Sequence, residues 1–331
     1  MSYLDLDIEL YRKMYMIYKS ELEIIKYYPD DEMRTPMHMS QGQEAISVGV
    51  CHALQPEDQV FATYRSHAAF LAKTGDIKAF FAELYGKVSG TAYGKAGSMH
   101  LSKPSQGHML SSAIVASSIP VAVGAAFANK FKRNNLISCV FFGDGALEEG
   151  SFWESLNLAC VMNLPVLFVC ENNGYAVHTP KHIRQSYESI NRILNQFGCT
   201  NYERTLVDVN DIYKTTLKAI KRIYETGKPS FFHIHCIRNL EHVGINTDFH
   251  VGYRAKDESY LSCINSTFRR QREKIIESSE SLAYVLDLEK EVNHEILESI
   301  ELAMRAGFPN TNQLTKGIDR KSTRLNSSHR L

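Results

Sequence analysis

Two short motifs, Gly143-Asp144-Gly145 and Asn172-Asn173-Gly174-Tyr175, contain the residue types in this chain that are best suited to chemistry. Asp144 supplies a carboxylate, Asn173 an amide oxygen and Tyr175 a backbone carbonyl. All three are hard oxygen donors, which together with phosphate oxygens and water suit an octahedral magnesium ion. Histidine and cysteine are absent from this ligand set, so zinc is not expected there.

The glycines of the first motif suit a phosphate group beside that cation. Gly143 and Gly145 permit backbone conformations that a side chain would forbid, and they let a ligand approach closely. The amides of Gly145 and Ala146 begin the next predicted helix, whose end carries a partial positive charge and free N–H donors. Each motif alone is a weak signal. Together they predict a magnesium-bound diphosphate.

Two predicted strands must position these motifs. The apolar runs 136–142 and 164–170 each end directly before a motif, and the segment between them is helix-like. This pattern is typical of a strand, a crossover helix and a neighbouring parallel strand. Asp144 and Asn173, 29 positions apart, should then face one crevice at the sheet edge where α/β proteins bind ligands.

Two further polar clusters follow predicted strands. Tyr64-Arg65 follows the strand 60–63, and the segment 238–242, which contains Arg238 and His242, follows the strand 231–237. An arginine beside a tyrosine at a strand end suits an anion, although a surface ion pair is the more common role. The three clusters together indicate one site at one edge of the sheet.

The other segments supply the helices and loops around this sheet. Residues 86–112 form a long loop rich in glycine, serine, lysine and histidine, and such loops are usually functional or disordered. A helix of small residues is expected over 113–131, for helix packing or a subunit contact. The remaining expected elements are helices over 3–28, 40–54, 181–197 and 210–226, a strand at 203–207 and a charged, helical C-terminal part.

Composition limits the class of protein. The 331 residues are 44% hydrophobic, which is ample for a large core. The net charge of +0 suggests no nucleic-acid or membrane-surface partner, and no apolar run reaches the roughly 20 residues of a membrane span. Seven cysteines without a CxxC motif, and an acidic N-terminus unlike a targeting peptide, favour reduced thiols and a cytoplasmic location.

The last residues, 319–331, are expected to be non-native. Asp319–His329 reads DRKSTRLNSSH, which back-translates to a sequence resembling a common sequencing adapter. A genuine basic, serine-rich tail is the alternative. We therefore exclude these residues from the expected fold.

The spacing of Gly143-Asp144-Gly145 and the Asn172-Asn173 pair resembles the thiamine diphosphate fingerprint. Most of 8–305 is similar to the alpha subunit of the thiamine diphosphate-dependent 2-oxo acid dehydrogenases, the first components of the pyruvate, branched-chain and acetoin dehydrogenases. The resemblance implies a single domain over 1–318 with a three-layer α/β thiamine diphosphate-binding fold, a mostly parallel sheet with helices on both faces, and helical extensions at both ends. The matching landmarks are Gly42–Ala45, Tyr64–His67, Gly97–His100, Ile114-Val115, Gly143–Gly150, Glu171–Pro180 and Tyr253-Arg254.

The resemblance also implies roles for individual residues. Asp144, Asn173 and the carbonyl of Tyr175 bind magnesium. His242 matches the active-site histidine of the family, which touches the diphosphate and assists the reaction; a positioned histidine is typically worth about 10²–10⁴-fold in rate. The other cofactor-binding residues are Gly143, Gly145, Ala146, Tyr64, Arg65 and Arg238 around the diphosphate, and the backbone near Ala113 and Val115 at the aminopyrimidine.

Two departures from the family pattern are visible. Ser112–Ala116 stands where the family usually has Gly-x-Gly-Ile-Val-Gly, so a tighter pocket is expected. Glu241 precedes His242 where the family has glycine, and it is expected either to raise the pKa of His242 or to contact the substrate. Glu241 therefore argues against ordinary pyruvate dehydrogenase activity.

The resemblance implies an enzyme that oxidatively decarboxylates a 2-oxo acid, or cleaves an acetoin-like compound, and transfers the acyl group to a lipoyl acceptor. A lipoyl-bearing acyltransferase is therefore a further expected partner. In this family the glutamate that activates the cofactor comes from a beta subunit, so the chain is expected to be inactive alone and to work in an alpha2beta2 heterotetramer. One alternative is the cofactor-binding half of a split transketolase-like carboligase or lyase without a lipoyl partner. Another is a non-catalytic paralogue, which would require loss of the cofactor ligands.

Overall fold

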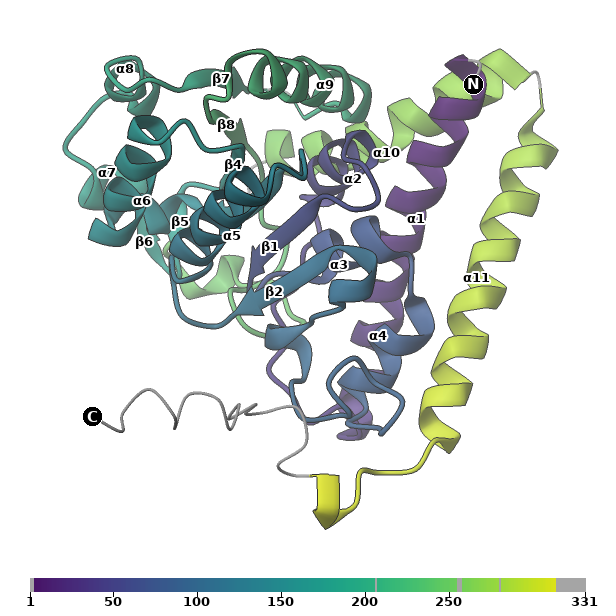
Figure 1. The fold of residues 1–331 in the computed structure, drawn as a ribbon. Helices are drawn as coiled ribbons and strands as arrows, with labels where there is room; N and C mark the ends of the chain where they lie inside the picture. Colours follow the sequence, from purple (N-terminus) through teal and green to yellow (C-terminus); the bar gives the residue numbers. More distant parts are fainter. Residues whose placement is uncertain (1–2, 206, 255–257, 280, 314–331) are drawn as a thin grey trace, which may run out of the picture.

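A computed structural model describes residues 3–205, 207–254, 258–279 and 281–313 (Figure 1). Its centre is a six-stranded sheet in the order β2-β1-β3-β4-β8-β7, in which every neighbouring pair is parallel. This confirms the predicted α/β fold. The strands are β1 Gln59–Thr63, β2 His108–Ser112, β3 Ser138–Gly143, β4 Val166–Asn172, β7 Thr200–Arg204 and β8 Ser230–His235, with a small antiparallel hairpin of β5 Tyr175–Ala176 and β6 Thr179–Pro180.

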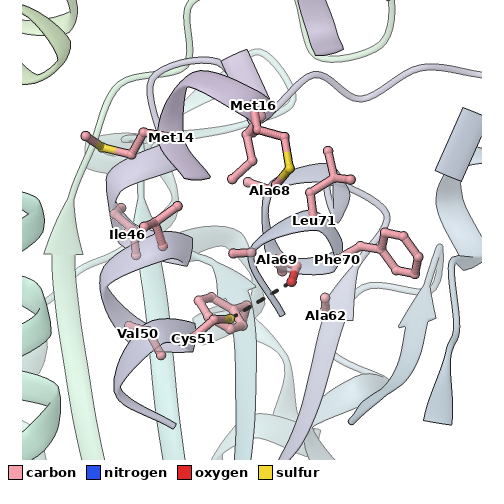
Figure 2. Close-up of a cluster of buried hydrophobic side chains, with 14 of the residues drawn as sticks. Met14, Met16, Ile46, Val50, Cys51, Ala62, Ala68, Ala69, Phe70 and Leu71 are labelled. Carbon is pink, nitrogen blue, oxygen red and sulfur yellow. Dashed lines mark hydrogen bonds between the residues drawn. The ribbon is translucent and has the colours of Figure 1, made fainter. Parts of the chain in front are cut away.

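Successive residues of one strand pack into two different cores. In β3, Cys139 and Phe141 belong to one buried cluster, whereas Val140 and Phe142 belong to the other. Because side chains alternate across a strand, the sheet is covered on both faces and the molecule has three layers. Figure 2 shows part of the larger cluster, where Cys51 lies beside Ala69.

Helices supply the outer layers. Figure 1 shows α5 and α6 on one side of the sheet and α1, α3 and α4 on the other. α1 ends at Tyr27 before Pro29, as predicted, because proline cannot continue the backbone ladder. The helices are α1 Tyr3–Tyr27, α2 Glu44–Ala53, α3 His67–Thr74, α4 Ile77–Leu84, α5 Ser118–Lys132, α6 Gly150–Val161, α7 Lys181–Arg184, α8 Ile190–Leu194, α9 Val209–Thr226, α10 Glu258–Ser279 and α11 Leu282–Arg305.

Five predicted boundaries are wrong. The helix expected from residue 40 begins at Glu44 as α2. Residues 108–112 form β2 instead of belonging to a loop, because they pair with β1. α5 begins at Ser118, five residues later than predicted, after Ala116 adopts a left-handed conformation with φ 62°. The predicted helix over 181–197 is split into α7 and α8, and β7 begins at Thr200, earlier than the predicted strand at 203–207.

The C-terminal helices pack along α1. Tyr11 donates a hydrogen bond to Glu289 at 2.6 Å, and Arg12 pairs with Glu295 at 2.8 Å. Among the described helices, none is both long and apolar enough to cross a membrane. The expected non-native tail, 319–331, lies outside the described residues.

Candidate functional site

Asp144 lies at the carboxyl end of β3, where a 3-10 helix, η4, runs from Asp144 to Glu148. Its side chain is buried, and Oδ2 lies 2.5 Å from Nη2 of Arg184. Its other oxygen, Oδ1, is buried and has no hydrogen-bond partner among the described residues. An unsatisfied buried polar atom costs about 1–3 kcal/mol, and more when charged, so this oxygen is suited to a cation.

Asn173 lies in a tight turn directly after β4. Its Oδ1 accepts a hydrogen bond from the amide of Tyr175 at 3.1 Å. Gly174, with φ +80°, makes this turn possible, and a side chain there would meet nothing within 4 Å. Because an amide oxygen has two lone pairs, Asn173 Oδ1 keeps one for another ligand. β3 and β4 are paired up to Gly143 and Glu171, so both motifs lie at the same edge of the sheet.

Arg184 and Gln185 hold the turn after β3, and the sequence did not indicate this role. Arg184 Nη1 lies 2.5 Å from Glu148 Oε2, and Gln185 Nε2 lies 2.6 Å from Glu148 Oε1. Burial opposes the charge of Arg184, but its hydrogen bonds to Asp144 and Glu148 outweigh burial and raise its pKa. α7 therefore closes over the first motif and positions the Asp144 carboxylate.

Three aromatic rings meet beside these turns. Tyr64 follows β1, and its ring centroid lies 5.5 Å from that of His242 and 4.5 Å from that of His38. Burial raises the pKa of Tyr64, so it remains a neutral phenol. His38, which the sequence did not single out, reaches the site because its backbone forms a bridge with Gly244 of the His242 loop.

Arg65 and Arg238 are both buried beside His242. Arg65 Nη1 donates to the carbonyl of Met39 at 2.6 Å and Nη2 to the carbonyl of His242 at 3.1 Å. Arg238 Nη1 donates to the carbonyl of Val177 at 3.1 Å, which joins the turn after β4 to the His242 loop. Two buried guanidinium groups side by side form a strongly anion-attracting site.

Both guanidinium groups face the same nitrogen of His242. Nδ1 lies 3.4 Å from Arg65 Nη2 and 3.5 Å from Arg238 Nη1. Arginine is always a donor, so Nδ1 is the acceptor and the ring proton is assigned to Nε2. Burial first, and then Arg65 and Arg238, lower the pKa of His242 to about 3. His242 is therefore a neutral imidazole that offers an N–H donor at Nε2.

Glu241 does not have the electrostatic effect that was one of its two predicted roles. The pKa of His242 is lowered, not raised. The Glu241 carboxylate accepts a hydrogen bond from the amide of Asn246 at 3.0 Å, so it is engaged in its own loop. The other predicted role, a contact with substrate, stays a prediction.

The landmark Tyr253-Arg254 stabilises the Arg238 segment from behind. Asp248 is buried between two arginines, with its oxygens 3.4 Å from Arg238 Nη2 and 2.7 Å from Arg254 Nε. Tyr253 hydrogen-bonds to both Asp248 and Arg238. The charges of the two arginines are thus partly compensated, which permits their burial.

Ala113 and Val115 lie in the turn between β2 and α5, as the shifted start of α5 requires. Val115 is 47% exposed and Ile114 is 72% exposed, so this turn presents an apolar surface to solvent. This turn follows β2, whereas Asp144 follows β3 and His242 lies in the loop after β8. Its predicted contact with the aminopyrimidine stays a prediction.

Comparison with known proteins points to one family. The family model described as dehydrogenase E1 component matches residues 12–312. The acetoin:2,6-dichlorophenolindophenol oxidoreductase alpha subunit of Bacillus subtilis is 31% identical over 312 residues, covering 93% of this chain and 92% of the relative. The protein of that name from Cupriavidus necator is 35% identical over 235 residues, 71% of each chain. The pyruvate dehydrogenase E1 component alpha subunit of Porphyra purpurea is 29% identical over 315 residues, 93% of this chain and 91% of the relative.

Proposed function

The chain belongs to the dehydrogenase E1 component family, and on that basis we propose that it is the alpha subunit of an enzyme that oxidatively decarboxylates a 2-oxo acid with thiamine diphosphate. One observation carries this proposal at the level of the site. Two buried arginines, a buried carboxylate with a free oxygen and an asparagine turn lie at one edge of the sheet. Such a set suits a metal-bound diphosphate.

The residues present fit a magnesium ion. Asp144 Oδ1 is a buried carboxylate oxygen without a partner, and Asn173 keeps a free lone pair. Asp144, Asn173 and the carbonyl of Tyr175 would hold the ion, because all three are hard oxygen donors. Arg184 would keep Oδ2 of Asp144 in place while Oδ1 binds the metal.

The diphosphate would be held by positive charge and by free amides. Arg65, Arg238 and the Tyr64 hydroxyl come from two loops, while the amides of Gly145 and Ala146 open the 3-10 helix after β3. Gly143 leaves open space, since a Cβ there would meet nothing within 4 Å. When bound, thiamine diphosphate supplies the carbanion and the electron sink for decarboxylation.

His242 would act as a hydrogen-bond donor and proton carrier. Its Nε2–H is the ring group left to donate, because Nδ1 faces two arginines. A bound diphosphate would offset the charge of those arginines and raise the pKa of His242 from its low value. The histidine could then exchange a proton near neutral pH, where general acid–base catalysis is most effective.

Acetoin-like cleavage is the second candidate activity. Two of the similar proteins are named acetoin oxidoreductase alpha subunits. The same site chemistry serves both reactions, since each places a carbonyl compound on the same cofactor. The choice between them depends on substrate contacts, where Glu241 stands beside His242.

We further propose an alpha2beta2 assembly that acts in the cytoplasm and transfers its acyl group to a lipoyl-bearing acyltransferase. The family implies a beta subunit partner and a small-molecule substrate. The test is to co-purify the chain with a beta subunit of the same family and to supply magnesium, thiamine diphosphate and either 2-oxo acids or acetoin with an artificial electron acceptor. Reduction should require both subunits, and full turnover by the chain alone would contradict the proposed division of the site.

A further inference from the structure

Three side chains of types that can bind metals lie together on β7, the edge strand of the sheet, and its neighbour β8. His233 and His235 are two positions apart on β8, so their side chains share one face of the strand. Glu203 of β7 is paired directly with His233 in the register of the two strands. The two imidazole rings lie 4.5 Å apart between their centroids.

The ligand atoms of this cluster converge on one point. Glu203 Oε1 lies 3.0 Å from His235 Nε2 and 3.3 Å from His233 Nδ1, and all three ligand atoms lie within 4.8 Å of one another. His233 is only 3% exposed, and its buried Nδ1 makes no hydrogen bond within the described part of the chain. Glu203 Oε1 is within ion-pair distance of this nitrogen but outside hydrogen-bond geometry, so a bound ion would satisfy the nitrogen better than the carboxylate does.

We propose that Glu203, His233 and His235 bind a divalent transition-metal ion, of which zinc is the model case, at a site separate from the magnesium ligands. Two imidazoles and one carboxylate are a common ligand set for such ions, whereas magnesium prefers oxygen donors alone. With bonds of about 2.0–2.1 Å, tetrahedral ligand atoms lie roughly 3.3 Å apart, close to the distances of 3.0 and 3.3 Å from Glu203 Oε1 to the two imidazole nitrogens. Small side-chain rotations would complete the site.

The surroundings supply both support and access. Asn172 Nδ2 lies 2.8 Å from Nε2 of His233, on the far side of the ring from the cluster. Metal-binding histidines are usually held in this way through their second nitrogen. With a metal on Nδ1, Nε2 carries the proton and donates to the Asn172 amide oxygen, which requires that amide to turn. His235 is 38% exposed at its side chain and Glu203 45%, so an ion can enter from solvent and keep a water ligand.

The site also adjoins the cofactor turn. Asn172 precedes Asn173, and its Oδ1 now accepts the amide of Gly174 at 3.0 Å. Turning the Asn172 amide would change that hydrogen bond. A metal at the cluster would therefore alter the support of the Asn173 turn.

The test uses the full chain, stripped of metals and kept in millimolar Mg²⁺ so that oxygen-only sites are occupied. Zn²⁺ is titrated by calorimetry and Co²⁺ by visible absorption. His235→Ala and Glu203→Gln remove the two accessible ligands without disturbing the buried core. His294→Ala, an exposed histidine on α11, is the matched control.

We expect one Zn²⁺ per wild-type chain, with affinity reduced at least about tenfold in His235→Ala and Glu203→Gln and unchanged in His294→Ala. Co²⁺ should give d–d bands without a thiolate charge-transfer band. The proposal is overturned by a wild-type chain without stoichiometric Zn²⁺ binding, by equal affinities in all variants, or by a thiolate band, which would place the ion on cysteine. None of these outcomes depends on decarboxylase activity.

Discussion

At the residue scale, Asp144 is the position on which the proposed metal site depends. It is buried, Arg184 pairs with one carboxylate oxygen, and no described residue hydrogen-bonds to the other oxygen. Asp144→Ala should weaken magnesium-dependent thiamine diphosphate binding at least about 100-fold. Loss of a direct metal ligand should reduce affinity at least as much as loss of a residue that supports a ligand. Calorimetry on the chain with its beta subunit measures this loss.

The matched control is Glu148→Gln. Glu148 also contacts Arg184 and Gln185, but it is not among the proposed ligands. This variant should keep binding within a few-fold of the wild type. If Asp144→Ala bound the cofactor as tightly as Glu148→Gln, the metal ligands would be assigned wrongly.

His242 gives the residue-scale prediction on pH. Burial, Arg65 and Arg238 lower its pKa to about 3 in the folded chain, whereas an unfolded histidine titrates near 6.5. The unfolded state therefore binds the extra proton first, and the stability that His242 contributes above pH 6.5 is lost as pH falls toward 3. His242→Gln should reduce the slope of unfolding free energy against pH in this window by at most about 1.4 kcal/mol per unit.

Chemical denaturation at a series of pH values measures that slope. His294→Gln, at an exposed position of α11, serves as the control and should leave the slope unchanged. An unaltered slope in His242→Gln would mean that the imidazole is not held neutral. Saturation with the cofactor should reduce the contribution of His242 to this slope, because the bound diphosphate would raise the pKa of His242.

At the element scale, the turn between β2 and α5 is unusual because Ala116 has φ 62°. A left-handed alanine costs the folded state roughly 1–2 kcal/mol, and glycine would remove this cost. Glycine also loses the buried methyl group and makes the unfolded chain more flexible, and these two losses together are of similar size. Ala116→Gly should therefore change the unfolding free energy by less than about 0.5 kcal/mol. The family pattern of glycine at this turn follows from the same backbone requirement.

Ala113→Gly is the comparison within the same turn. Ala113 is not among the residues with positive φ. Glycine there would increase the conformational entropy of the unfolded chain without removing backbone strain from the folded state. It should destabilise the chain by roughly 0.5–1 kcal/mol. Thermal or denaturant unfolding of the pair measures the difference, and equal losses in both variants would refute the strained turn.

At the scale of the whole molecule, one helix carries an apolar stripe that the described residues leave largely exposed. Val121, Phe127 and Phe131 of α5 are 48%, 46% and 81% exposed, and Gly124 between them has nothing within 4 Å of its Cβ position. Exposed apolar stripes usually mark interfaces, and a glycine lets another helix approach closely. We expect this stripe to meet a partner subunit.

Phe131→Glu should then weaken assembly with the beta subunit at least about tenfold, since a charge would be buried at the contact. Sedimentation of the co-expressed subunits measures the assembly. Leu302→Glu places the same charge on an exposed leucine of α11 and should leave assembly intact. Equal behaviour of the two variants would exclude α5 from the interface.

The fold and the position of the candidate site could be predicted in outline from local patterns. The runs 136–142 and 164–170 are apolar and end in glycine-rich or asparagine-rich turns, and they became β3 and β4 with Asp144 and Asn173 after their ends. β2 was missed because an edge strand needs little apolar character when its partner is already in place. The start of α5 was missed because small residues alone do not reveal a left-handed turn.

The sequence by itself determined the parallel α/β fold and the family, because apolar periodicity and motif spacing are properties of neighbouring positions. It also predicted which residues serve as ligands. Only the tertiary structure decided the state of those residues. Arg184 pairs with Asp144, and burial, together with the charges of Arg65 and Arg238, lowers the pKa of His242. Glu203 meets His233 and His235 across a strand pair. These contacts join residues from separate segments, and their energies depend on burial, which no local pattern records.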